Sequence, residues 1–302
     1  MKTNRIFQQF SFLFFALFLS FSAQAGINQK VVTEIPEANV KRIINSYKAK
    51  GYAAIWIDGF RHRTGVATNG KTKTFFNVIF EKKSNAADYQ ISVGLDFIVY
   101  PAGHPVMQLE SYLSNNGKIR YAVIYRSSGS ANVKSVHVPA NQFQAKFNQM
   151  KGQGYHLVSR SIVRKGGSLF TTGLFEKSNV GAWLSKPNLT AGQATNLMLA
   201  QRNKGRTLVH MDIPNKFPTR YNLIFHTKPA NAGWYAKNNL TKAQLTAEIA
   251  QAKGNGYRVT MINGFDKPGL VNGNEVHYQR FTATFVKPKG VGGVGSFQLK
   301  SK

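Results

Sequence analysis

Three pairs of an arginine and an aromatic residue are the side chains of this sequence best suited to bind a ligand. They are Arg120-Tyr121, Arg220-Tyr221 and Arg280-Phe281, and they occupy corresponding places in three similar segments. Adjacent residues of a strand face opposite ways, so if the aromatic row is core, we expect the arginines to point outward. Guanidinium groups can pair bidentately with phosphate, sulfate or carboxylate. The alternative is a solvated strand face that discourages edge pairing.

Further cations and two tryptophans extend this candidate surface. The cations crowd around the first predicted turn and are Arg61, Arg63, Lys71 and Lys73. If exposed, Trp183 and Trp234 could stack on sugars or on single-stranded nucleic acid. We therefore expect binding through basic hairpin faces, with the tryptophans as possible aromatic contacts.

No motif for catalysis is present. The sequence lacks Gly-x-Ser-x-Gly, a phosphate-binding loop and the zinc-hydrolase pattern His-Glu-x-x-His, and it has no cysteine. His210 and His226 could meet across one hairpin near Asp212 as a metal set, with exposed strand histidines as the alternative. We expect no metal or cofactor and favour a non-enzymatic protein. A triad whose members meet only in the fold stays open.

The charge balance points to an anionic partner. The 302-residue chain has 40 Lys+Arg against 12 Asp+Glu, a formal net charge of +28. Removing an N-terminal leader that carries Lys2 and Arg5 and no acid would leave +26. A field of this sign concentrates anions and speeds their association. The alternative is a basic surface kept for solubility.

Residues 1–25 have the pattern of a secretory signal. Lys2 and Arg5 precede an apolar stretch at 10–21, and Ala23-Gln24-Ala25 forms a small-x-small cleavage site. The stretch is shorter than the roughly 20 residues that span a bilayer as a helix. We expect an exported chain, periplasmic or extracellular, without a transmembrane segment. Export disfavours nucleic acid as the normal partner and favours anionic envelope or extracellular glycans.

The elements that must position these side chains repeat about every 51 residues. Trp183 and Trp234 are 51 residues apart, and a glycine follows each predicted helix at almost equal intervals. These glycines are Gly51, Gly103, Gly154, Gly205 and Gly256. Such a period is typical of units that stack because none can bury its apolar face alone.

Each unit has the pattern of a helix, an antiparallel hairpin and a short linking strand. Apolar spacing predicts helices over residues 37–50, 88–99, 140–152, 190–203 and 241–254. Thr190 and Thr241 suit N-caps, and the following glycines suit left-handed C-caps. The second hairpin strand ends in an aromatic residue in every unit: Phe80, Tyr125, Phe175, Phe225 and Phe285.

The sequence therefore predicts an α+β fold of five repeats in a domain spanning 26–289. The approximate repeats are 27–84, 85–130, 131–180, 181–231 and 232–289, followed by a Gly-rich linker and strand-like tail at 290–302. The units could form an open curved array or a closed ring of pseudo-fivefold symmetry. We favour closure because it removes exposed sheet edges, with the tail supplying the last pairing.

The repeated signature resembles the tandem repeats of the polyglycine hydrolases. It reads W-x-A/S-K-x-N-L-T at 183–190 and 234–241, then a helix, G-Y-R or a variant, and a hairpin ending R-Y-x-x-I-F. The resemblance covers almost all of 27–300. In that family the repeats are the non-catalytic part, and hydrolysis belongs to a β-lactamase-like domain that needs Ser-x-x-Lys. No serine here has lysine three residues on, so the resemblance implies a repeat architecture without that active site.

We thus expect an exported, non-enzymatic scaffold that binds polyanionic surfaces or polymers. One alternative is a peptide or cell-wall recognition module, alone or docking a separately encoded hydrolase, whose binding to a neutral partner would survive high salt. Another is a hydrolase with an unrecognised site, which a cleft joining a histidine, a serine and a carboxylate would support.

Overall fold

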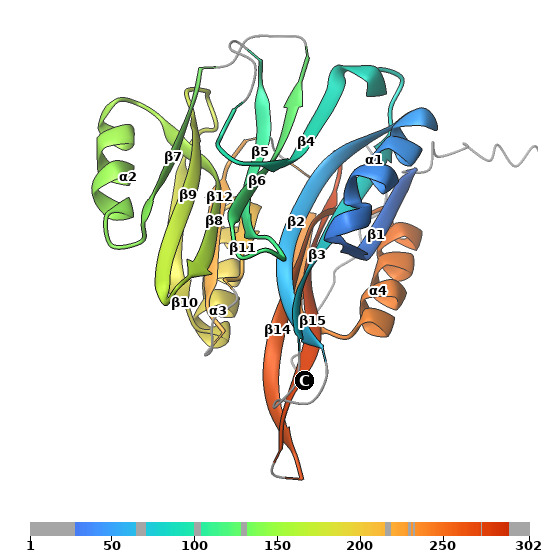
Figure 1. Cartoon of the computed structure of the whole chain (residues 1–302). Helices are drawn as coiled ribbons and strands as arrows, with labels where there is room; N and C mark the ends of the chain where they lie inside the picture. Colours follow the sequence, from blue (N-terminus) through green and yellow to red (C-terminus); the bar gives the residue numbers. More distant parts are fainter. Residues whose placement is uncertain are drawn as a thin grey trace, which may run out of the picture.

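The described part of the chain contains five three-stranded antiparallel sheets of identical strand order (Figure 1). The computed structural model describes residues 28–64, 71–99, 104–127, 132–214, 219–228, 231, 233–272 and 274–289. The predicted leader, Gly103 and the C-terminal tail lie outside these residues. In chain order the sheets are β1-β3-β2, β4-β6-β5, β7-β9-β8, β10-β12-β11 and β13-β15-β14. The fold is therefore α+β and built from repeated units.

Each sheet consists of a leading strand and a hairpin, with the second hairpin strand in the middle. The leading strands are β1 (Gln29–Pro36), β4 (Tyr89–Leu95), β7 (Val133–Pro139), β10 (Trp183–Leu189) and β13 (Gly233–Leu240). The first hairpin strands are β2 (Tyr52–Thr64), β5 (Val106–Leu113), β8 (His156–Lys165), β11 (Thr207–Asp212) and β14 (Arg258–Val271). The second hairpin strands are β3 (Lys71–Lys82), β6 (Ile119–Arg126), β9 (Ser168–Glu176), β12 (Tyr221–His226) and β15 (Asn274–Lys287).

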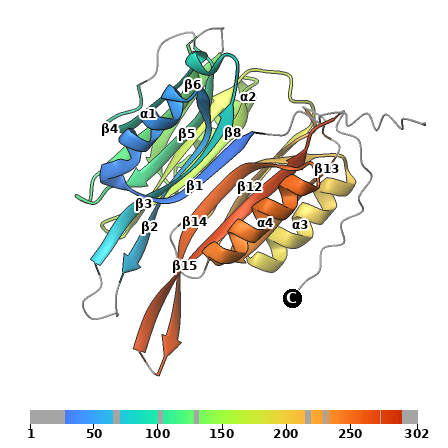
Figure 2. The same cartoon turned by 90° about the vertical axis from the view of Figure 1, so that its right-hand side faces the viewer.

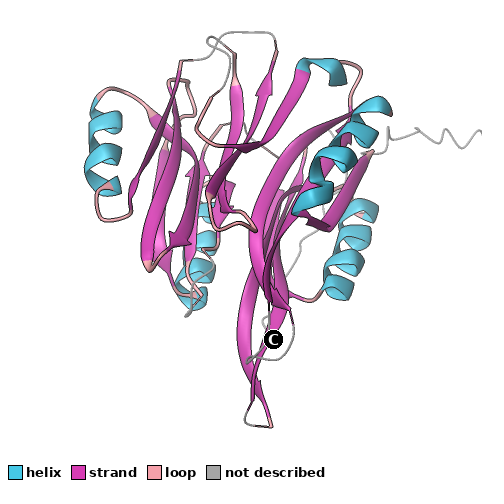
Figure 3. Ribbon diagram, in the orientation of Figure 1, coloured by secondary structure: helices cyan, strands magenta, loops and turns pink. Residues whose placement is uncertain are grey.

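The helices lie at the periphery, and the strands fill the middle (Figure 3). They are α1 (Val40–Ala49), α2 (Phe143–Gly152), α3 (Ala191–Asn203) and α4 (Lys242–Gly254), with short 3-10 segments at Glu37–Asn39 and Ala86–Asp88. Within the described part of the chain, no helix has the length and apolar character needed to cross a membrane.

The predicted helix ends are confirmed. The hydroxyls of Thr190 and Thr241 accept the backbone N–H of Gln193 and Gln244, whose side chains bond back to complete capping boxes. After the helices, the glycines adopt left-handed φ values that a Cβ atom disfavours: Gly51 (74°), Gly154 (81°), Gly205 (69°) and Gly256 (76°).

The predicted helix over 88–99 is wrong. Tyr89–Leu95 form β4, which pairs with β6 as the leading strand of the second sheet. Apolar residues at every second position between 91 and 99 have strand spacing rather than helical spacing. Only residues 96–105 separate β4 from β5, too few for a helix of three turns and its connections.

In the four units that have an α-helix among the described residues, one face of the sheet packs against that helix. Val40 and Ile44 of α1 pack with Ile57 and Phe76 in one buried cluster. The aromatic positions predicted to close the second hairpin strands are at most 1% exposed in four of the five sheets: Phe80, Phe175, Phe225 and Phe285. The helix-covered face is therefore the core that the sequence predicted.

The opposite face packs against the next sheet. The first hairpin strands β2, β5, β8, β11 and β14 are called the inner strands here. They contact one another in chain order, and β14 also contacts β2. Each is an edge strand of its own sheet, so half of its backbone N–H and C=O groups have no partner within that sheet.

Side chains of the following inner strand bond to these edge groups. The Gln108 side chain accepts the Ile57 N–H at 2.8 Å and donates to the Ile57 carbonyl oxygen at 2.6 Å. The Ser159 hydroxyl contacts the N–H and C=O of Leu109 at 3.3 and 3.2 Å. Backbone groups that a neighbouring strand would otherwise bind are thereby satisfied.

Contacts of the same kind join the first sheet to the last. The Trp56 indole N–H donates to the Ile262 carbonyl oxygen at 2.9 Å, and the Asp58 carboxylate accepts the Gly264 N–H at 2.8 Å. Phe60 packs directly on Gly264, where an added Cβ would lie 2.6 Å from the ring. Glycine is needed at this position because the two strands approach so closely.

Gln108→Leu should lower the free energy of unfolding by about 2–4 kcal/mol, because it leaves the Ile57 N–H and C=O buried without partners. Urea denaturation monitored by circular dichroism measures this loss. Gln144→Leu, at an exposed position of α2, is the matched control and should change stability by less than about 0.5 kcal/mol. Equal effects of the two substitutions would contradict a role of these bonds in joining the sheets.

Candidate functional site

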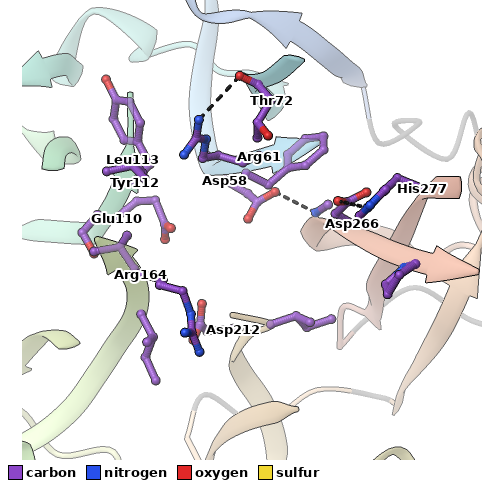
Figure 4. Close-up of a pocket in the computed structure, with 18 of the residues that line it drawn as sticks. Asp58, Arg61, Thr72, Glu110, Tyr112, Leu113, Arg164, Asp212, Asp266 and His277 are labelled. Carbon is purple, nitrogen blue, oxygen red and sulfur yellow. Dashed lines mark hydrogen bonds and ion pairs between the residues drawn. The ribbon is translucent and has the colours of Figure 1, made fainter. Parts of the chain in front are cut away.

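A cavity of about 340 Å³ opens among the inner strands (Figure 4). Three acids from three different sheets line it, Asp58, Glu110 and Asp212, and none is more than 8% exposed. Phe60 and Tyr112 form part of its wall. The cavity thus combines buried carboxyl groups with apolar surface.

The three acids occupy equivalent positions in their strands. Each strand has a β-bulge, at Ala54–Trp56 in β2, Val106–Gln108 in β5 and Leu208–His210 in β11, and each acid lies four residues after the first residue of the bulge. Two of them are fixed by hydrogen bonds. In addition to its bond from β14, Asp58 accepts the side-chain amide of Asn77 at 2.8 Å. Asp212 accepts the side-chain amide of Asn222 at 2.8 Å and the backbone N–H of Ile162.

Glu110 departs from this pattern. At the equivalent position of β8, the Ser161 hydroxyl accepts the Ser111 N–H at 2.8 Å, so it also bonds to the preceding inner strand. Glu110 has one methylene group more than aspartate. Its carboxyl group makes no hydrogen bond or ion pair with any residue that the structure describes, and Figure 4 shows it directed into the cavity.

Burial raises the pKa of all three acids. It raises the pKa of Asp58 and of Asp212 to about 7, although hydrogen bonds to both carboxylates act in the opposite direction. Burial, followed by the negative charges of Asp58 and Asp212, raises the pKa of Glu110 well above its ordinary value. Near neutral pH the cavity therefore holds fewer negative charges than its composition implies.

Two long hairpins, β2–β3 and β14–β15, project on one side of the molecule (Figures 1 and 2). Asp266 of β14 joins them: its carboxylate lies 2.9 Å from Nδ1 of His62 and 2.6 Å from Nδ1 of His277. Ser111 also lines the cavity, but its hydroxyl bonds Ser161 at 2.7 Å. Within the described residues, no serine bonds either of these two histidines, so no Ser-His-Asp arrangement forms here.

For Arg120 and Arg280, the expectation that the arginines point outward is wrong. Arg120 is the cross-strand partner of Tyr112, and Arg280 is that of Phe265. Cross-strand partners share a face, and Tyr112 shares its face with Glu110 two residues earlier. These arginines therefore lie on the inner face. The sequence argument assumed one solvated face, whereas the sheets pack on both.

The three arginines are half-buried, and two are engaged locally. Arg120 forms an ion pair with Asp96, and the guanidinium of Arg280 lies 5.0 Å from the centre of the Tyr278 ring. Arg220 immediately precedes β12. They do not form the continuous external stripe expected from the sequence.

The other predicted cations lie together on the β2–β3 hairpin. Lys71 and Lys73 are exposed, whereas Arg61 and Arg63 are half-buried. Arg61 lines the cavity, as does Arg164 of β8. All four cations thus lie on the first hairpin, as the sequence predicted. The register places Arg61 and Arg63 on one face of the hairpin and Lys71 and Lys73 on the other.

The predicted aromatic contacts belong to the interior. Trp234 is 6% exposed, and its indole N–H donates to the Arg206 carbonyl oxygen at 2.8 Å. Trp183 is half-buried and packs on Phe147, with ring centroids 5.7 Å apart. Trp234 in particular offers no ring face to a ligand.

The histidines considered as metal ligands are also internal. His210 and His226 are 1% and 5% exposed, which contradicts their interpretation as surface residues. Burial lowers the pKa of both to about 4. Nε2 of His210 contacts the backbone of Arg160, as the equivalent Gln108 does with Ile57. Across the described ranges, no group of three or more His, Cys, Asp and Glu residues is placed to hold a metal ion.

Sequence reasoning missed the cavity acids because it treated the carboxylates as scattered. A signal was present: Glu110 follows Asp58 by 52 residues, and Asp212 follows Glu110 by 102, close to one and two repeat periods. An alignment of the repeats strand by strand would have shown that these acids occupy equivalent positions.

Comparison with protein families gives a match to the model described as polyglycine hydrolase-like, structural repeat. It matches residues 34–83, 136–178 and 231–288, together half of the chain. These segments fall on the first, third and fifth sheets. Comparison with curated proteins gives no match.

Asp212→Asn should flatten the pH dependence of stability. The folded protein retains a proton on Asp212 up to about pH 7, whereas the unfolded chain releases it near pH 3.8. A raised carboxyl pKa therefore costs stability progressively as pH rises from about 4 to 7, by up to about 4 kcal/mol. Relative to the parent, the variant should gain stability over this window in urea denaturation.

The control is Asp96→Asn, at a carboxylate whose side chain is 65% exposed, which should not reproduce the trend. A difference between Asp212→Asn and the parent that stays constant from pH 4 to 8 would contradict the buried, protonated state of Asp212.

Proposed function

Because the chain belongs to the family of polyglycine hydrolase-like structural repeats, we propose that it is an exported, non-enzymatic binding scaffold. In this proposal five repeats close into a ring and hold polyanionic surfaces or polymers, such as envelope or extracellular glycans. The observation that carries it is the basic β2–β3 hairpin beside the mouth of the central cavity. The signal-like pattern of residues 1–25 supports export of the chain.

Closure of the ring is supported by the contacts between inner strands. The bonds from Trp56 and Asp58 to β14 repeat the pattern that joins β5 to β2 and β8 to β5. Closure leaves no inner strand without a neighbour, so the inner edges of the sheets are not open to pairing with another chain. The tail proposed from the sequence to complete the ring is not needed for the β14–β2 contact.

Polyanion binding is supported by the charge and exposure of the hairpin. Lys71 and Lys73 are exposed on a segment that projects from the sheets, where a polymer could reach them (Figure 2). Arg61 of the same hairpin and Arg164 of β8 line the cavity and add to the positive charge of this side of the molecule. With a net charge of +28, long-range attraction brings polyanions to the surface, and the hairpin gives them a defined place to bind.

Lys71→Ser combined with Lys73→Ser should weaken retention of the protein on a sulfated polysaccharide. Loss of two contacting cations should reduce the slope of log affinity against log salt by roughly 1–2. The matched control is Lys151→Ser combined with Lys253→Ser, which removes two exposed cations from the ends of α2 and α4. If both double variants behave alike, binding is not localised to the hairpin.

The same salt series distinguishes the polyanion scaffold from the alternative function, a peptide or cell-wall recognition module. A neutral peptide or cell-wall fragment that stays bound at high salt would replace the polyanion scaffold by a recognition module. Such a module would require a partner selected by shape and hydrogen bonding rather than by charge.

A further inference from the structure

The central cavity reverses the charge balance of the chain. Only 12 acids occur against 40 lysines and arginines, yet five of those acids line this one cavity: Asp58, Glu110, Asp212, Asp266 and Glu275. The basic residues that line it are Arg61, Arg164 and His277. A basic protein that gathers its scarce carboxylates in one place creates a local field that favours cations.

Most of these acids already have partners. Asp58 and Asp212 accept backbone and asparagine N–H groups, and Asp266 contacts two histidines. Glu275 is 49% exposed at the mouth. These four acids are accounted for by bonds that join strands or hairpins, or by access to solvent.

Glu110 is different because nothing in the described structure satisfies it. It is 6% exposed, has no hydrogen-bond or ionic partner among the described residues, and is directed into the cavity toward the side on which Asp58 and Asp212 lie (Figure 4). Buried carboxyl groups are normally paired, because burial without a partner is costly. Positions that break a local rule of the fold are expected at functional sites.

We infer that Glu110, with Asp58 and Asp212, binds a protonated primary amine carried by a small organic molecule. An ammonium group offers three donors, which matches a floor of three acceptor groups. This site is independent of the polyanion site proposed on the β2–β3 hairpin.

The shape and lining favour an organic cation over a bare ion. The cavity volume of about 340 Å³ is that of a small organic ligand site. Its walls include Phe60, Tyr112, Val163 and Ile213, which suit a hydrocarbon chain or a sugar ring. In the part of the chain that the structure describes, no metal-ligand cluster is present.

Binding of an amine must compete with protons on the floor. Ionised carboxylates attract the cation, so binding should release protons, and the affinity should rise with pH from about 6 to 8. The charged and titratable groups that line the cavity around this floor are Asp58 and Arg61 of β2, Tyr112 of β5, Arg164 of β8, Asp212 of β11, Asp266 of β14, and Glu275 and His277 of β15. The positive charge of Arg160 of β8 also acts on Asp212. Of these, Asp58 and Asp212 have pKa values near 7 and should account for much of the released proton.

Isothermal titration calorimetry of the full chain tests the site with three pairs of probes. Glucosamine, triglycine amide and 1,5-diaminopentane carry the amine on a sugar, a peptide terminus and an alkyl chain, and their N-acetylated forms are the matched neutral probes. At least one amine should bind about tenfold or more tightly than its acetylated form at pH 8. The pair that binds best identifies the source of the amine.

Glu110→Gln should weaken binding of that amine by about tenfold or more, because the amide cannot carry a negative charge. Asp88→Asn removes one acid outside the cavity lining and should leave the affinity unchanged. The Lys71→Ser, Lys73→Ser variant should also bind the amine normally, so failure of the polyanion proposal and failure of this one are distinguishable.

A measurement on the unaltered protein keeps the test independent of how Glu110→Gln folds. Titration in two buffers of different ionisation enthalpy should show net proton release on binding at pH 7. Three outcomes would each overturn the inference: none of the three amines binds at 10 mM (roughly −2.7 kcal/mol), the amines bind no more tightly than their acetylated forms, or the affinity does not depend on pH.

Discussion

The unpaired edges of the inner strands are the constraint on which the rest of the structure depends. Each inner strand pairs with one neighbour in its own sheet and presents a row of N–H and C=O groups on its other side. Side chains of the following unit, among them Gln108 and Ser159, satisfy these groups. Because side chains rather than a further strand supply these hydrogen bonds, the sheets remain separate sheets while the bonds join each to the next. Trp56 makes the same kind of contact across the junction between the first and last sheets.

This arrangement also explains why polar and charged residues are buried at the centre. The side chain four residues after the start of the bulge points at the preceding inner strand. There Asp58 accepts the backbone N–H of Gly264, and Ser161 accepts that of Ser111. Such residues are structural, and the raised pKa of Asp58 is the cost of that role. Glu110 occupies the same position without the same bond, which leaves a carboxyl group facing the cavity. A small departure from a repeated structural pattern thus places a carboxyl group in the cavity lining.

Local structure was predictable wherever it depended on neighbours in sequence. The capping boxes at Thr190 and Thr241 and the left-handed glycine at Gly51 follow from residue type alone. The helix predicted over 88–99 was wrong because the apolar residues of this segment alternate, which indicates the strand that forms there. The arginines were misplaced because alternation along a strand separates two faces without saying what covers each of them.

The sequence by itself determined the repeat of about 51 residues, the α+β content, the helix caps and the strongly basic charge. Each of these depends on composition or on contacts within one unit. Tertiary structure alone decided which face of each sheet is internal, where Arg120 and Trp234 lie, and that acids 52 and 102 residues apart line one cavity. The physical reason is that contacts between units depend on how edge strands are satisfied, and that is settled only when all the sheets are in place.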